Sequence, residues 1–376
     1  STLFPYTTLF RSDIPWISAK SLRVFDIEDS EDRVTQEGAS SGTKLVPSGS
    51  VLFVVRGMSL AKEFRVGVTR REVAFNQDLR GIVPYPDVDA RFLARYLRHA
   101  QQSILTHADN AAHGTRRLPT DLLAAVPVPL PPLGQQKRIA AILDQADAIR
   151  RKRRAAAEAT AALNPAGFCE MFGDPGTNPR HWPIVDMSEV VRETQYGTSS
   201  ALEVEKRRYP VLRMNNITYS GDWQLNDLKW LDFGNGDVAK YTIRRGDLLF
   251  NRTNSPELVG KTAVWPYEEA YGFAGYLIRV RFDESRVLPE FVSSYLNSRF
   301  GKSLLFKSAV PSNNMSNISA STFRRLPLML PPVKMQDKFV EYQDQVRRST
   351  GRQRIAENEC DALFHSLVHR AFRGEL

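Results

Sequence analysis

Apolar residues follow two different spacings along this chain. Short runs of β-prone residues, at 51–55, 81–83, 247–250 and 277–282, predict strands. Near residues 89–102 and 289–306 the apolar positions instead recur at helical spacing, which predicts amphipathic helices. Each strand-rich region then ends in a proline-rich stretch, which predicts a stiff, extended connector. The pattern is typical of an α+β protein.

Two long segments that follow these connectors show an a/d heptad pattern, which predicts two long helices. The two helices could pair with each other through these apolar seams, or each could pack on its own domain. Pairing is the interpretation that we adopt. The predicted seam positions are Ile139, Ile142, Ala146 and Ile149 in the first helix, and Phe339, Tyr342, Val346, Leu363 and Leu367 in the second.

The two halves of the chain repeat each other. PVPLPP at residues 127–132 recurs as PLMLPP at 327–332, an offset of 200, and Ile139 and Phe172 meet Phe339 and Phe372 at the same offset. Upstream the match continues with small slips in the offset. A period this long indicates a duplicated domain, because solenoid repeats are only about 20 to 50 residues long. A duplicated module on one chain suggests a target with two parts.

The repeat divides the chain into five predicted segments. Residues 1–12 resemble the translation of a common sequencing-adapter oligonucleotide, and we expect them to be an assembly artefact. The second repeat has residues 182–208 ahead of its match to Ile14, and the first repeat lacks their counterparts, so we expect its first domain to be truncated. The predicted segments after residue 12 are a domain at 13–132, a helix at 133–172, a domain at 173–332 and a helix at 333–376.

Composition and charge permit a nucleic-acid partner without requiring one. The chain has 376 residues, of which 51 are Lys or Arg and 42 are Asp or Glu, giving a net charge of +9. Basic proteins commonly bind polyanions such as DNA or RNA. Two cysteines are too few for a disulfide framework or a zinc site and fit a reducing cytosol. Because no apolar run is long enough for a membrane helix, we expect a cytoplasmic protein with no membrane partner.

Catalytic signatures are scarce. The triplet Asp227-Leu228-Lys229 has the Asp-x-Lys spacing of some metal-dependent nucleases, but no upstream metal carboxylate accompanies it. His365 and His369 lie one helical turn apart without a third ligand. We therefore predict no catalytic residues and no metal site. A self-contained nuclease or methyltransferase with an unrecognised site stays open as an alternative.

Polar and basic loops are the better functional signal. Asparagine can bond to adenine edges, arginine can fork onto guanine, and lysine and arginine neutralise phosphates. These loops differ between the repeats, whereas the apolar framework matches. This is the pattern expected of two domains that share one scaffold and read different DNA sequences. Alternatively, loops simply diverge and asparagine forms turns. The predicted DNA-binding residues are Lys20, Arg56, Lys62, Arg65, Arg70, Arg71, Asn110, Arg116 and Arg117 in the first repeat, and Arg213, Asn215, Asn216, Asn251, Arg252, Asn254, Lys261, Asn313, Asn314 and Asn317 in the second.

A run of five basic residues, 150–154, lies on the first heptad helix. It could be a solvated face, or it could contact phosphates between two half-sites or the acidic surface of a partner.

Several motifs, taken in order and duplicated, resemble one family. LPPLGQQKRI at 130–139 resembles the region after the first recognition domain of type I restriction-modification specificity subunits, and FCEMFGDP at 168–175 resembles the segment that follows. AFRGEL at 371–376 is similar to the family's C-terminal ending, and GDLLF at 246–250 with LVGK at 258–261 resembles its recognition-domain strand and loop. The similarity covers nearly the whole chain after residue 12.

The resemblance implies two strand-rich target recognition domains separated by two long helices that form an antiparallel coiled coil. It also implies a non-catalytic subunit that reads a bipartite target in double-stranded DNA and binds two modification subunits and restriction subunits. The chain itself would bind no cofactor. S-adenosylmethionine would belong to the methyltransferase subunits, and ATP and Mg²⁺ to the restriction subunits.

Two features depart from the family's pattern. The first domain lacks its opening segment, and Gln135 stands where the family usually has an acidic residue before glutamine. The second copy has Lys334-Met335-Gln336 at the matching place. A further alternative is therefore a scaffold that assembles with partners but has lost specific DNA reading.

Overall fold

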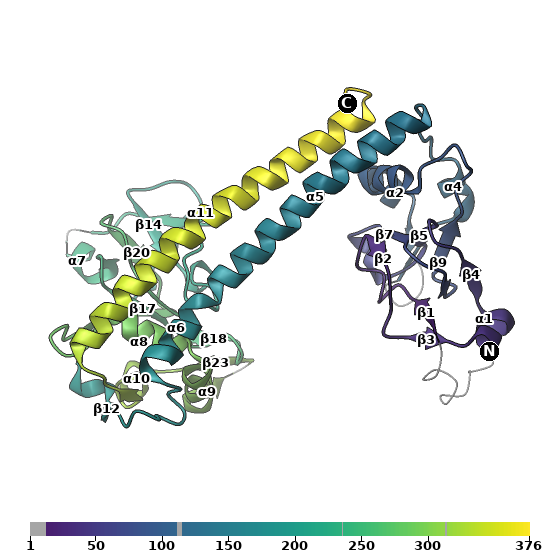
Figure 1. Cartoon of the computed structure of the whole chain (residues 1–376). Helices are drawn as coiled ribbons and strands as arrows, with labels where there is room; N and C mark the ends of the chain where they lie inside the picture. Colours follow the sequence, from purple (N-terminus) through teal and green to yellow (C-terminus); the bar gives the residue numbers. More distant parts are fainter. Residues whose placement is uncertain (1–12, 111–114, 235, 313) are drawn as a thin grey trace. The chain divides into compact units, whose positions relative to one another are not determined.

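The computed structural model describes residues 13–110, 115–234, 236–312 and 314–376. The chain forms two compact units. Unit 1 comprises Ser1–Ala155 together with Arg354–Leu376, and unit 2 comprises Ala156–Gln353. Unit 1 is therefore built from both ends of the chain, which are purple to blue and yellow in Figure 1. The predicted adapter-like segment 1–12 lies outside the described residues.

A first four-stranded sheet is repeated in the two units. In both, the two central strands run parallel, and each outer strand is antiparallel to its neighbour. The order in unit 1 is β3 (Arg33–Val34), β1 (Ile14–Ile17), β8 (Val73–Phe75) and β4 (Lys44–Val46). The order in unit 2 is β15 (Lys229–Leu231), β14 (Tyr209–Leu212), β20 (Tyr271–Phe273) and β16 (Thr242–Ile243).

A second four-stranded sheet matches in three of its strands. β5, β7 and β9 of unit 1 pair as β17, β19 and β21 do in unit 2, all antiparallel. The outer strand differs, because β2 lies beside β7 whereas β13 lies beside β21. The order is β2 (Asp26–Ile27), β7 (Val66–Thr69), β5 (Val51–Val54), β9 (Leu79–Ile82) in unit 1 and β13 (Val191–Tyr196), β21 (Leu277–Phe282), β17 (Leu248–Asn251), β19 (Thr262–Val264) in unit 2.

Each unit also has a small three-stranded sheet, which we call the ribbon. The ribbon of unit 1 consists of β10 (Asp109–Asn110), β11 (Arg116–Arg117) and β6 (Arg56–Gly57). The ribbon of unit 2 consists of β22 (Val310–Ser312), β23 (Met315–Asn317) and β18 (Thr253–Asn254). Unit 2 further pairs β12 (Ile184–Asp186) with β24 (Pro327–Met329).

Short helices cover these sheets. α2 begins where the Asp89 side chain accepts a hydrogen bond from the Phe92 amide, which satisfies one free donor of the first turn. α9 is capped in the same way by Ser298. The short helices are α1 (Gln36–Gly42), α2 (Ala90–His99), α3 (Gln101–Leu105) and α4 (Thr120–Ala124) in unit 1, and α7 (Val238–Tyr241), α8 (Pro289–Asn297), α9 (Arg299–Ser308) and α10 (Ala320–Arg324) in unit 2. Single 3₁₀ turns occur at Met58–Ala61, Met187–Glu189 and Met214–Asn216.

Long helices begin directly after the two proline-rich connectors. They are α5 (Leu133–Ala161), continued by α6 (Leu163–Phe172), and α11 (Val333–Phe372). In unit 1, α5 packs through Ile139 and Leu143 against Phe92 of α2 and Ala371 of α11. In unit 2, Phe172 of α6, Phe291 of α8 and Phe339 of α11 form the equivalent cluster. The centroid of the Phe172 ring lies 4.9 Å from that of Phe291 and 5.4 Å from that of Phe339.

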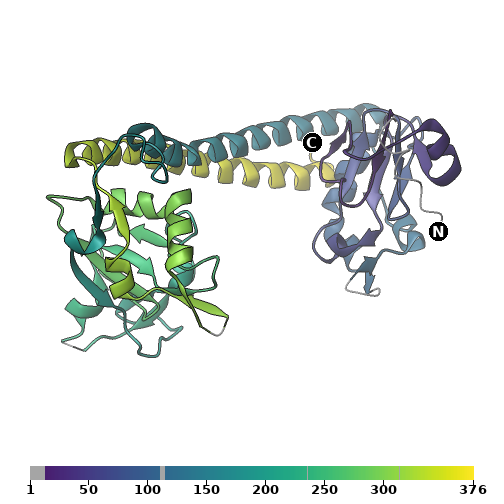
Figure 2. The same cartoon turned by 90° about the horizontal axis from the view of Figure 1, so that it is seen from below.

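The long helices pair in antiparallel fashion within each unit (Figures 1 and 2). Arg154 of α5 lies 3.4 Å from Glu357 of α11 in unit 1, and the Tyr342 hydroxyl donates to the Leu163 carbonyl in unit 2. Residue numbers along α11 therefore decrease in the direction in which those along α5 and α6 increase. This confirms the predicted α+β fold with strand-rich regions and two antiparallel long helices.

A buried glutamine fixes the start of each long helix. Gln136 and Gln336 are almost completely buried. The Gln336 Oε1 accepts from the Leu288 amide, and its Nε2 donates to the Pro331 and Arg286 carbonyls. The Gln136 side chain makes the matching three bonds with Asp89, Pro131 and Asp87. The duplicated glutamine therefore joins connector, domain helix and long helix in both units.

The predicted seam is partly wrong. Ile139, Phe339 and Val346 are buried, and Ile142, Ala146, Tyr342 and Leu367 are half-buried, but Ile149 and Leu363 are 47% and 59% exposed. Leu143, Asp147 and Phe364 are buried instead. The physical reason is that Asp147 faces inward to bind Arg95, which turns the next predicted seam residue on α5, Ile149, toward solvent.

No helix among the described residues is long and apolar enough to cross a membrane.

Candidate nucleic-acid interface

The two ribbons occupy equivalent places in the two units. In each, the chain runs from a central core strand, β5 or β17, directly into one ribbon strand. The Leu118 amide donates to the Val55 carbonyl in unit 1, and the Ile318 amide donates to the Arg252 carbonyl in unit 2, both at 2.8 Å. Arg117 pairs with Arg56, and Asn317 pairs with Thr253. The backbone therefore presents different side chains at matching positions.

The ribbon of unit 1 is cationic. Arg56 and Arg117 are exposed and directly opposite each other, and Arg116 is half-buried on the same strand. The backbone of Asn110 pairs with that of Arg116, and the Asn110 side chain is not among the described parts of the structure. Guanidinium groups at this density can bind phosphates or fork onto guanine.

The described strands of the unit 2 ribbon carry no charged residue, and their polar side chains are amides and hydroxyls. Asn317 is half-buried, and its Oδ1 accepts a hydrogen bond from the Thr253 hydroxyl. Asn314 is exposed at the turn between β22 and β23 with a φ of 63°, a backbone conformation that asparagine tolerates better than most residues. Asn313 lies outside the described residues. Amide side chains of this kind can pair with adenine.

Arg252 stands at the entry to this second ribbon. Its guanidinium lies 5.1 Å from the centroid of the Tyr196 ring, and its buried Nε has no hydrogen-bond partner among the described residues. Tyr196 is 40% exposed and Tyr276, whose carbonyl accepts from the Arg252 amide, is 52% exposed. The sequence analysis selected Arg252 but missed both tyrosines. A tyrosine at the end of a strand of mostly polar residues was the signal that could have found Tyr196.

Four predicted DNA contacts are buried, which contradicts their assignment as reading residues. Asn216, Asn251, Asn254 and Lys261 are at most 9% exposed. Asn216 bonds the Arg213 amide and the Gln224 carbonyl, and the Asn254 Nδ2 donates to Asn251 Oδ1. The Lys261 ammonium donates to the Met214 carbonyl, and burial lowers its pKa. These groups satisfy turns inside the domain, as buried polar groups must.

The other predicted DNA-binding residues form ion pairs or are exposed to solvent. Lys20, Lys62 and Asn215 are exposed. Arg65 pairs with Glu63, Arg70 with Asp26 and Arg213 with Asp227, and the Arg71 guanidinium donates to the Asp13 carbonyl.

Asp227, the candidate nuclease carboxylate, is an ion-pair partner. The Arg213 guanidinium donates to it at 2.7 Å and holds the pKa of this exposed carboxyl below its usual value. Within the described ranges, no three His, Cys, Asp or Glu side chains are placed to hold a metal ion.

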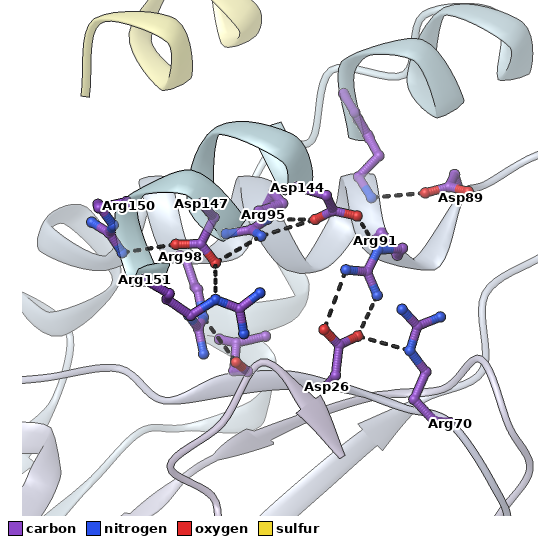
Figure 3. A network of polar contacts seen from close by, with 12 residues as sticks. Asp26, Arg70, Asp89, Arg91, Arg95, Arg98, Asp144, Asp147, Arg150 and Arg151 are labelled. Atoms are coloured by element: carbon purple, nitrogen blue, oxygen red, sulfur yellow. Dashed lines mark hydrogen bonds and ion pairs between the residues drawn. The ribbon is translucent and has the colours of Figure 1, made fainter. Parts of the chain in front are cut away.

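A network of arginines and aspartates joins the first domain to its long helix (Figure 3). Arg91 of α2 binds Asp26 of β2 and Asp144 of α5. Arg95 lies 2.9 Å from Asp144 and 3.1 Å from Asp147. The Arg95 and Asp147 side chains are only 4% and 6% exposed, so removing either partner would leave an uncompensated buried charge. The network fixes the orientation of the ribbon-bearing domain on α5.

The basic run 150–154 contributes to these ion pairs. Arg150 lies 2.9 Å from Asp147, and Arg154 lies 3.4 Å from Glu357 on α11. Lys152 and Arg153 are exposed. Part of the run therefore joins α5 to α11.

A family model described as "Type I restriction modification DNA specificity domain" matches residues 7–159 and 180–358. The EcoKI specificity subunit of the type I restriction enzyme from Escherichia coli strain K12 is 26% identical over 274 residues, which is 66% of this chain and 57% of that protein. The EcoR124I/EcoR124II specificity subunit from Escherichia coli is 28% identical over 137 residues, 36% of this chain and 34% of that protein. The chain thus spans between about a third and three fifths of the length of these curated relatives.

Two solved structures have a similar fold. A type I restriction-modification system S subunit from M. genitalium aligns with a TM-score of 0.59 and 11% identity, covering 98% of this chain and 91% of that chain. A chain from a structure concerned with complex assembly and conformational transition of the type I R-M system aligns with a TM-score of 0.58 and 20% identity, covering 97% and 93%.

Proposed function

This chain belongs to the type I restriction-modification DNA specificity family, and from that premise we propose that it reads a bipartite target in double-stranded DNA, one half-site with the ribbon of each unit. The reading is by contact alone, and the chain carries out no chemistry of its own.

One observation carries the proposal. The ribbons of the two units have the same register, yet Arg56 and Arg117 stand where Thr253 and Asn317 stand in the other copy. Here the backbone is held constant while arginine is exchanged for amide and hydroxyl groups, the types that discriminate guanine from adenine in the major groove.

The partners follow from the same proposal. The long helices would hold two modification subunits, and the complex would recruit restriction subunits. In unit 1, Ile149 of α5 and Ile355 and Leu363 of α11 are large apolar side chains that are 47% to 61% exposed. We propose that a modification subunit covers these side chains, which lie on the two long helices. S-adenosylmethionine, ATP and Mg²⁺ would be bound by the partner subunits.

The test is selection from a random DNA library by the chain co-purified with its modification subunit, at one fixed salt concentration, since phosphate contacts make affinity salt-dependent. We expect two enriched half-sites at a constant spacing. Enrichment of one half-site would restrict reading to one unit. An intact complex that enriches no sequence would refute the proposal and leave a scaffold.

Variants assign each half-site to its ribbon. Arg117→Ala should relax only one half-site and Asn317→Ala only the other, each by about 1–3 kcal/mol, or roughly 5-fold to 150-fold in discrimination. Lys44→Ala and Arg245→Ala are matched controls, because both side chains are exposed and lie outside the ribbons. Equal effects of all four variants on both half-sites would contradict the assignment.

A further inference from the structure

The edge strand of each ribbon places one more side chain beside the residues that differ between the units. In unit 2, Val310 of β22 is directly opposite Asn317 of β23. In unit 1, Asp109 of β10 is directly opposite Arg117 of β11. Directly opposite residues of antiparallel strands project from the same face of a sheet. Val310 and Asp109 therefore occupy the same position in the two ribbons, which we call the outer position.

The outer position of unit 2 is open to solvent. Successive residues of a strand point to opposite faces, and on one face the opposed pair Asn254 and Ser316 is only 9% and 4% exposed, so that face packs on the domain. On the other face, Asn317 is half-buried and Val310 is 64% exposed. The Thr253 hydroxyl holds the Asn317 Oδ1 from the buried side. A ligand that reaches the Asn317 amide from solvent therefore meets Val310 as well.

The outer position of unit 1 is accessible in the same way. Asp109 is exposed, and so is Arg117 opposite it. Among the residues that the structure describes, Asp109 has no ion-pair partner. Its carboxylate is therefore free to accept a hydrogen bond from a ligand.

The residue types at the outer position fit base edges better than phosphates. A carboxylate is repelled by a phosphate, and a valine side chain has no group that binds one. In the major groove, by contrast, a carboxylate accepts a hydrogen bond from the amino group of cytosine, and an apolar side chain contacts the C5 methyl group of thymine. The groove admits a two-stranded ribbon, and in unit 2 the exposed pair of ribbon strands is β22 with β23.

We propose that the outer position of each ribbon reads a second base. Val310 contacts the C5 methyl group of a thymine in one half-site, and Asp109 accepts a hydrogen bond from the amino group of a cytosine in the other. Neighbouring strands lie about 4.8 Å apart and successive base pairs about 3.4 Å apart, so each base lies within about two base pairs of the one that Asn317 or Arg117 reads. This inference rests on the proposed function, because it specifies bases within the half-sites that the ribbons read.

The first test removes single methyl groups from the DNA. It uses the chain co-purified with its modification subunit and the duplex selected from the random library, at one fixed salt concentration. Each thymine is replaced in turn by deoxyuridine, which lacks only the C5 methyl group. We expect one replacement to weaken binding about fourfold, as the loss of one buried methyl group would. In Val310→Ala, that replacement should have no further effect.

A matched variant controls for the loss of an exposed apolar side chain. Phe306 is 60% exposed and lies on α9, outside the ribbon. In Phe306→Ala, the same deoxyuridine replacement should still weaken binding about fourfold.

The second test exchanges the residues at the outer position and repeats the selection. Val310→Asp should change the preferred thymine to cytosine, and Asp109→Val should change the preferred cytosine of the other half-site to thymine, each by at least about fivefold. Both side chains are exposed, so the domains should still fold. The half-site of the unaltered unit should stay enriched, which reports that the complex is intact.

The proposal is overturned if no deoxyuridine replacement weakens binding, or if the loss is as large in Val310→Ala as in the unaltered chain. It is also overturned if both half-sites stay enriched and neither exchange alters a selected base. A first selection that enriches no half-site at all would overturn the proposed function as well, so the two failures are distinguishable.

Discussion

Replacing Gln336 with leucine tests whether the duplicated glutamine holds the long helix to its domain. The side chain is completely buried, and leucine has a similar volume, so the change leaves little cavity. It removes the hydrogen bonds to the Leu288 amide and to the Pro331 and Arg286 carbonyls, at 2.8, 2.8 and 3.3 Å. Only the bond to Pro331 is fully buried; the other two are partly buried.

The magnitude follows from the groups left without partners. A buried donor or acceptor without a partner costs about 1–3 kcal/mol, and partly buried groups cost less because water can reach them. We therefore expect unit 2 to lose about 2–4 kcal/mol. For a unit of this size the melting temperature should fall by about 4–16 °C. Gln336→Glu should cost at least as much, because a carboxylate oxygen would face the Pro331 carbonyl.

The assay is urea unfolding of the full chain, combined with hydrogen exchange of the Leu288 amide. Gln136→Leu is the matched change in unit 1 and should release the Asp89 amide. Gln145→Leu is the control, since Gln145 is exposed on α5. The reasoning fails if Gln336→Leu destabilises the chain no more than Gln145→Leu, or if exchange at Leu288 is unchanged.

Two further predictions concern the long helices. Burial opposes ionisation of Asp147, but Arg95, Arg150 and Arg151 outweigh it and hold its pKa below the usual value of 3.8. The ion pairs should therefore stabilise unit 1 above the unfolded pKa of about 3.9 and lose this effect as the pH falls through the folded pKa. The difference in unfolding free energy between the chain and Asp147→Asn should shrink below about pH 4; a difference independent of pH would contradict this. A Cβ on Gly167 would overlap the Tyr342 ring, so Gly167→Ala should cost about 1–3 kcal/mol in thermal unfolding, whereas Gly351→Ala, with open space around it, should not; equal melting temperatures would disprove the close packing of α6 on α11.

Duplication made much of the fold predictable. Matching apolar runs predicted the central strands, and the proline-rich stretches predicted where the long helices begin. A seven-residue repeat placed Ile139 and Phe339 correctly in the helix packing. It failed at Ile149, because a buried Asp147 is invisible to a pattern that counts apolar residues.

The sequence predicted which loops form the candidate site better than it predicted which of their side chains are exposed. Asn251 and Asn317 both occur in polar loops, yet one is completely buried and the other half-buried on the ribbon. The same amide chemistry that pairs with a base also satisfies a turn, so composition alone cannot separate the two roles. The register of the ribbon, which places Arg117 at the position of Asn317, emerges only from the backbone pairing.

Unit 1 combines residues up to Ala155 with residues from Arg354 onward, so its two parts are synthesised at different times. Phe372 of α11 packs against Phe92 and Tyr96 of α2, and the Gln135 side chain donates to the carbonyl of Leu376. Unit 2 is continuous in sequence and can complete its core during translation. At about 5–20 residues per second, the first segment of unit 1 waits about 10–45 s for its final helix. During that interval Phe92 and Ile139 have no partner on α11, which makes the nascent first domain the point in biogenesis most exposed to aggregation and to chaperones.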